Sequence, residues 1–126
     1  MPTVIRKSSG ATILETRREI LHAVSWQVRS HVWSPPTDVY ETEKAYVVLV
    51  EIAGMRDDDF DVSLENNTLQ ISGSRHDFLD RRAYQQMEIR FGKFSTAVNL
   101  PGPVFMDQAH AEYQDGFLKV VLPKVI

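Results

Sequence analysis

Four aspartates lie close together between Asp57 and Asp61, and carboxylates at this density are the side chains that bind calcium ions. A calcium loop of the helix-loop-helix kind places acidic ligands at alternate positions, glycine at the sixth position and glutamate at the twelfth. Counted from Asp57, these two positions hold Val62 and Thr68. The spacing therefore predicts a solvated turn between strands and no calcium site.

Histidines are the second type of side chain here that binds metals or transfers protons. None of them forms an H-x-x-H or H-x-H pair, and the chain has no cysteine. His76 with Asp77 and Asp80 comes nearest to a ligand group, but isolated surface histidines fit the spacing better. The sequence contains no nucleophile elbow, P-loop or dinucleotide-binding glycine pattern. We therefore expect no catalytic residues, no metal, no cofactor and no enzymatic activity. The four histidines are His22, His31, His76 and His110.

Length and composition limit the remaining classes of protein. The chain has 126 residues, of which 43% are hydrophobic and 25% charged, enough for one domain with a core. The net charge of −3 does not favour a nucleic-acid partner. The longest apolar run, residues 45–55, is interrupted by Glu51 and is too short to cross a membrane. Nothing near Met1 resembles a signal peptide, so we expect a cytoplasmic protein with no membrane partner.

Residues 12–30 repeat apolar side chains at helical spacing, and Thr12 with Glu15 resembles a capping box. This pattern predicts an amphipathic helix in an N-terminal arm. Its apolar stripe packs either on the protein's own body or on a second copy or client, and the sequence leaves both open. The stripe consists of Ile13, Leu14, Ile20, Leu21, Val24 and Val28.

The two prolines at 35 and 36 end the helical pattern and mark a boundary between the arm, residues 1–34, and the body, residues 35–126. In the body the periodicity changes to two, which is typical of strands. Asp115-Gly116 between two alternating runs predicts a hairpin. The fold class that we expect is all-β: an immunoglobulin-like antiparallel β-sandwich preceded by a helix. The predicted strands are 37–41, 45–52, 60–66, 68–73, 83–90, 93–100 (which can also continue 83–90), 110–114 and 116–122.

From residue 35 to residue 124 the sequence resembles the alpha-crystallin domain of the small heat shock proteins. Four segments carry the resemblance in the family's order: "PPTDVYETEKAYVVLVEIAGM", "LQISGSR", "FGKFSTAVNLP" and "AEYQDGFLKVVLPK". The resemblance implies an ATP-independent holdase, which binds partly unfolded client proteins and prevents their aggregation. Its apolar surface would be the stripe of the arm together with Trp26 and Trp33.

The resemblance also implies a dimer in which a loop of one subunit adds a strand to the other subunit, with higher oligomers built from it. Here the loop is residues 75–88, and its partner is the first body strand. The alternative is a loop folded back on its own subunit. The candidate residues for exchange are Asp38, Val39, Tyr40, Phe78, Leu79, Arg82 and Tyr84.

Two departures from the family pattern affect assembly. The family places an arginine two residues after the phenylalanine of Gly-x-Phe, where this chain has Thr96 after Phe94. Family members continue into a tail bearing Ile-x-Ile, whereas this sequence stops at Ile126, so we expect smaller or differently built assemblies. The residues predicted for a groove that accepts such a tail are Val62, Leu64, Ala109, Ala111 and Tyr113.

Two other classes of protein are alternatives to a chaperone. A co-chaperone adaptor with the related CS-domain sandwich would lack the Gly-x-Leu and Leu-Pro-Lys closing pattern and the long loop, which this chain has. An all-β enzyme or carbohydrate-binding module would need paired carboxylates or a row of exposed aromatic residues, and neither pattern is found in the sequence.

Overall fold

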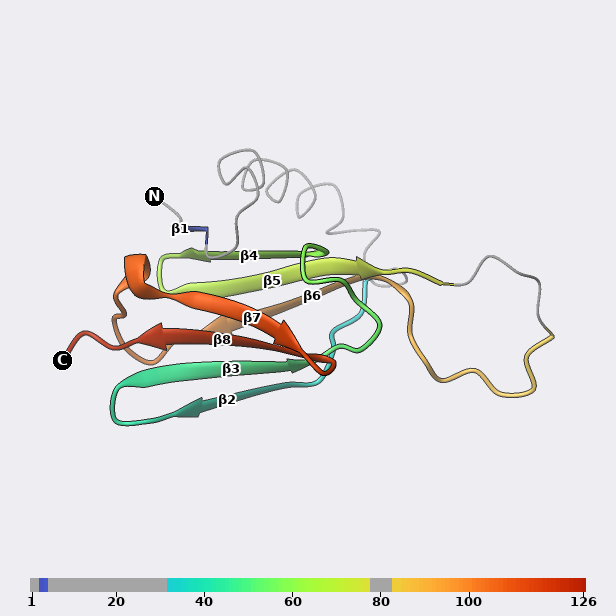
Figure 1. Cartoon of the computed structure of the whole chain (residues 1–126), viewed down its shortest axis with the longest axis horizontal. Coiled ribbons are helices and arrows are strands. Elements are labelled where there is room, and N and C mark those ends of the chain that lie inside the picture. The colour runs from blue at the N-terminus through green and yellow to red at the C-terminus, as the bar shows by residue number, and fades with distance from the viewer. Residues whose placement is uncertain (1–2, 5–31, 78–82) are drawn as a thin grey trace.

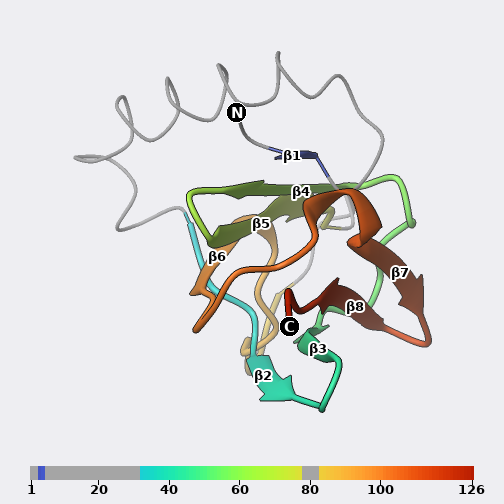
Figure 2. The same ribbon diagram turned by 90° about the vertical axis from the view of Figure 1, so that its left-hand side faces the viewer.

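The computed structural model describes residues 3–4, 32–77 and 83–126, and the predicted helix over 12–30 lies outside them. The described residues form two antiparallel sheets, ordered β1-β4-β5-β6 and β2-β3-β8-β7, which face each other as a sandwich (Figures 1 and 2). The predicted all-β sandwich is confirmed. Its elements are β1 (Thr3–Val4), β2 (Thr37–Glu41), β3 (Ala45–Glu51), β4 (Phe60–Glu65), β5 (Thr68–Arg75), β6 (Gly92–Asn99), the 3-10 helix η2 (Met106–Gln108), β7 (His110–Gln114) and β8 (Phe117–Pro123).

The core lies between the two sheets and is formed by every second residue of the inner strands. Successive side chains of a strand point to opposite faces, so an alternating sequence buries one set. On β8, Leu118, Val120 and Leu122 are fully buried, as the period of two predicted. Opposite them, Phe60 and Phe94 bring large aromatic rings into the same core, with centroids 6.2 Å apart.

Tight turns set the register of the hairpins. Asp115 and Gly116 have φ values of 53° and 84°, and they connect β7 to β8 as predicted. β8 pairs with β7 on one side and β3 on the other, so the last strand lies inside its sheet. At the β4–β5 turn, Asn67 adopts a φ of 65°, and its side-chain amide donates to the carbonyls of Leu100 and Gly102 at 2.9 and 3.0 Å. This residue ties two loops together at one end of the sandwich.

The prediction of a strand over 83–90 is wrong for the isolated chain. β6 begins only at Gly92, and residues 83–90 take part in none of the strand pairings of the described chain. They leave the sandwich where β5 ends and β6 begins, and project beyond both sheets (Figure 1). A strand forms only where a neighbour accepts its main-chain hydrogen bonds, so its apolar alternation alone does not make it one here.

Candidate functional site

The exposed edge of β2 is the first candidate surface. Among the described residues β2 pairs as a strand with β3 alone, so its second edge is available to another strand. Val39 and Tyr40 are 45% and 46% exposed, so two adjacent large apolar side chains lie on this open strand. Asp38, also predicted to take part in exchange, lies on the same exposed strand.

Residues 83–91, which we name the projecting segment, form the second candidate surface. Tyr84 is 46% exposed, Met87 58% and Ile89 66%. From residue 86 onwards apolar and polar side chains alternate, which is the pattern of a strand that is half covered. The other loop residues predicted for exchange, Phe78, Leu79 and Arg82, lie outside the described residues.

Met87 and Ile89 were missing from the residues predicted for exchange, although the predicted strand over 83–90 contained them. The predicted loop residues, from Phe78 to Tyr84, lie earlier in the loop, where Phe78, Leu79 and Tyr84 are more apolar than a surface loop requires. The period-two alternation after residue 86 is the signal that identifies Met87 and Ile89.

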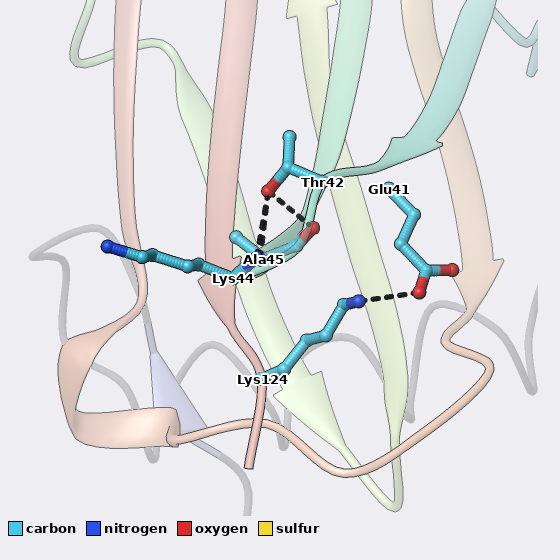
Figure 3. A network of polar contacts seen from close by, with 5 residues as sticks. All are labelled: Glu41, Thr42, Lys44, Ala45 and Lys124. Atoms are coloured by element: carbon cyan, nitrogen blue, oxygen red, sulfur yellow. Dashed lines mark hydrogen bonds and ion pairs between the residues drawn. The ribbon is translucent and has the colours of Figure 1, made fainter. Parts of the chain in front are cut away.

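The end of β2 at Glu41, and the turn that follows it, are held in place by contacts with Lys124 (Figure 3). Lys124 Nζ lies 2.5 Å from a carboxylate oxygen of Glu41, and the Lys124 amide donates to the carbonyl of Lys44 at 2.8 Å. Within the turn, Thr42 Oγ1 accepts a hydrogen bond from the Ala45 amide at 3.0 Å. The Glu41 side chain is 55% exposed and that of Lys124 16%, and an ion pair with one partner in solvent contributes only about 0.2–1 kcal/mol, so the main-chain bonds also fix this end of the edge.

The predicted tail-docking residues lie on β4, on β7 and just before β7, around the same part of the core. Two of them are too deeply buried to contact a docked tail. Val62 and Leu64 are 1% and 0% exposed and belong to the core, while Ala109 and Ala111 are half-buried against it. In addition, β1 pairs with β4 along Ser63 and Leu64, next to these residues. Tail docking stays a prediction, and a docking strand at this position would meet β1.

Tyr113, the fifth residue of that set, joins β7 to the chain that follows β3. Its hydroxyl donates to the carbonyl of Ile52 at 2.8 Å and accepts from the Met55 amide at 3.3 Å. Its ring packs on Phe60 with centroids 5.1 Å apart. These contacts make Tyr113 a structural residue of the sandwich.

We expect Tyr113→Phe to lower the free energy of unfolding by about 1–2 kcal/mol, because the part-buried carbonyl and amide lose their partner while the ring packing remains. Urea denaturation followed by circular dichroism measures the change. Tyr84→Phe is the matched control, because Tyr84 lies on the projecting segment, and its effect should be close to zero. Equal stability of Tyr113→Phe and the parental protein would contradict this role.

Trp33 and Thr96 tie the two sheets together on the side opposite β4 and β7. The Trp33 amide donates to the carbonyl of Lys93 at 3.1 Å, and the Trp33 ring lies 5.7 Å from that of Phe94. Thr96, at the position of the family arginine, accepts a hydrogen bond from the Thr37 hydroxyl at 3.3 Å.

Of the residues predicted for client binding, Trp33 is thus half-buried against the body. The other seven, Ile13, Leu14, Ile20, Leu21, Val24, Trp26 and Val28, lie outside the described residues.

No group of three or more histidine or acidic residues suited to a metal ion occurs in the part of the chain that the structure describes. Within the same residues, no helix has the length and hydropathy required to cross a membrane.

The geometry defines a class of protein: a β-sandwich that presents an exposed edge strand and an apolar projecting segment suited to pairing with another chain. Comparison with known proteins is more specific. Residues 38–126 match the model of the Hsp20/alpha crystallin family, and the chain belongs to this family. The resemblance stated from the sequence motifs is confirmed.

Individual relatives agree with this assignment. The chain is 32% identical over 95 residues to small heat shock protein C4 of Rickettsia felis, covering 74% of this chain and 58% of the relative. It is 37% identical over 94 residues to the 17.7 kDa class II heat shock protein of Arabidopsis thaliana, covering 71% and 60%. The chain thus spans about 60% of the length of these relatives.

Among solved structures, heat shock protein 16.0 of Schizosaccharomyces pombe matches with a TM-score of 0.67 and 32% identity, over 73% of this chain and 87% of that one. The β-sandwich is therefore similar to that of a solved small heat shock protein.

Proposed function

We propose that this protein is an ATP-independent holdase of the cytoplasm, without enzymatic activity, which binds partly unfolded proteins and prevents their aggregation. The observation that supports it most directly is the exposed apolar surface of the projecting segment in a member of the Hsp20/alpha crystallin family. Met87 and Ile89 are more than half exposed and lie on the same segment with one residue between them, and exposed apolar side chains that gather in one place mark a site of contact with another protein. The apolar stripe predicted for the arm, over residues 12–30, would be a second apolar surface, and it would stay available to clients when a partner covers the projecting segment.

The same surfaces support a homodimer formed by strand exchange. The projecting segment of one subunit would pair with the β2 edge of the other, so that each covers apolar groups that the isolated chain exposes. A two-fold dimer repeats this contact twice. We place the arm, residues 1–34, in client binding and in the assembly of larger oligomers.

The holdase proposal is tested by the light scattering of a client that aggregates on heating or on reduction of its disulfides, without ATP. We expect the scattering to fall as the protein is added, and ATP to make no difference. An unrelated soluble protein at equal mass concentration is the control. If an equimolar amount leaves the scattering unchanged, the holdase function is wrong.

A further inference from the structure

Arg75, the last residue of β5, makes an unusual number of contacts for a residue at the end of a strand. Its Nε donates to the carbonyl of Arg90 at 2.9 Å, and its Nη2 donates to the same oxygen. Its Nη1 donates to the carbonyl of Ala53 at 3.3 Å. The guanidinium lies 4.7 Å from the centroid of the Trp33 ring and 5.5 Å from that of Phe91. Only a planar cation with several donors can make all of these contacts at once.

These contacts connect four parts of the chain that are far apart in sequence. Arg75 is the last residue of β5 and Arg90 lies two residues before β6, so one side chain joins both ends of the connection between these strands. Ala53 belongs to the turn after β3, and Trp33 lies just before β2, where the arm joins the body. The direction of the projecting segment is thereby linked to the sheet that carries the β2 edge.

Gly92 explains why such a link is needed. It is the register partner of Arg75 and has a φ of 90°, and a side chain there would meet no other atom within 4 Å. A glycine at positive φ in open space permits many directions for the residues before it. The bonds from Arg75 to the residue 90 carbonyl hold the chain on the far side of this glycine, and so select one direction.

We propose that Arg75 is the positioning residue of the projecting segment: it holds both ends of the loop against Trp33 and orients residues 83–91 for pairing with β2 of a second copy. This inference rests on the strand exchange proposed above. Ordering a segment before it binds lowers the entropy lost on association, so the contribution of Arg75 belongs to the dimer more than to the sandwich.

The test compares full-length Arg75→Ala, Arg75→Lys and Arg90→Ala with the parental chain by sedimentation equilibrium. Arg90 is the matched control because it contributes its main-chain carbonyl, which alanine retains, while its side-chain charge is lost. We expect Arg75→Ala to raise the dimer dissociation constant about tenfold, which corresponds to about 1.4 kcal/mol. Arg75→Lys should not restore it, because an ammonium group cannot replace the planar fork. Arg90→Ala should stay close to the parental value.

Hydrogen exchange of the amides of residues 83–91 gives a second readout, which a general loss of stability would not mimic. In Arg75→Ala these amides should exchange faster than in the parental chain, while those of β3 and β8 are unchanged. A dissociation constant that Arg75→Ala leaves unchanged would overturn the proposal. A monomeric parental chain would overturn strand exchange itself. In that case, unchanged exchange of these amides in Arg75→Ala would also rule out the positioning role of Arg75, and faster exchange would support it.

Discussion

Gly73→Ala is expected to lower the free energy of unfolding by about 3 kcal/mol, the upper end of the usual cost of overpacking. A Cβ atom at this position would lie 2.7 Å from the carbonyl oxygen of Asp59 and 2.8 Å from Cζ of Phe94. Both distances are below any ordinary contact, and neither neighbour can move freely. The carbonyl belongs to the backbone, and the Phe94 ring is 1% exposed and packed between Trp33 and Phe60.

The sign of this effect is informative because glycine is normally a poor strand residue, so that replacing it with alanine in a strand should stabilise. Urea denaturation followed by tryptophan fluorescence measures the change. Ser74→Ala, one residue further along β5, is the matched control and should change the free energy of unfolding by less than about 0.5 kcal/mol. A neutral or stabilising Gly73→Ala would contradict the close packing of Phe94 on this glycine.

A double-mutant cycle separates the two neighbours. Phe94→Leu removes the ring atoms nearest to Gly73 but leaves the Asp59 carbonyl in place. The double variant Gly73→Ala/Phe94→Leu should therefore be more stable than the sum of the two single changes predicts, with part of the cost remaining. Strict additivity would assign the whole effect to the backbone contact.

The core of the sandwich could be predicted from the sequence because its signal is local. Alternation along residues 116–122 already separates the buried from the exposed side chains, residues 45–52 form a nearly continuous apolar run, and the Asp115-Gly116 turn sets one register. Each of these features depends on a few neighbouring residues.

The wrong prediction over residues 83–90 has a different cause. From residue 86 onwards it alternates as a true strand does, but whether it forms one depends on a neighbour that the single chain does not supply. A sequence pattern predicts which face of a segment would be buried, but it does not identify the chain that buries it.

The contacts of Arg75 and the burial of Val62 and Leu64 could not be predicted from the sequence, because both depend on segments that are distant along the chain. Arg75 matches the family's Leu-x-Ile-x-Gly-x-Arg motif, but its partners Trp33, Ala53 and Arg90 come from three separate segments. The family resemblance implies a docking groove at Val62 and Leu64, but both side chains lie in the core. Periodicity identifies a face of a strand without saying how deeply it is covered.

Proline substitutions in the projecting segment are expected to have the largest effect on assembly. In a strand, the amides of consecutive residues point to opposite sides, so only one of Glu88 and Ile89 can donate its N–H to the β2 edge of a partner. Proline removes that donor and leaves an acceptor on β2 without its partner. The dimer carries each substitution twice. For one of the two variants, Glu88→Pro or Ile89→Pro, the dimer dissociation constant should therefore rise about a hundredfold, which corresponds to about 2.7 kcal/mol.

The other proline variant is the internal control, because its amide points to solvent and its loss should change the dissociation constant much less. Both residues lie on the exposed segment outside the strand pairings of the described chain, so thermal unfolding of the sandwich should be the same in both variants. Sedimentation equilibrium across a range of concentrations measures the two constants. If the two variants and the parental chain form equally stable dimers, residues 88 and 89 do not form the exchanged strand. A large difference between adjacent prolines is specific to main-chain pairing, because a contact made only by side chains has no reason to depend on the direction of an amide.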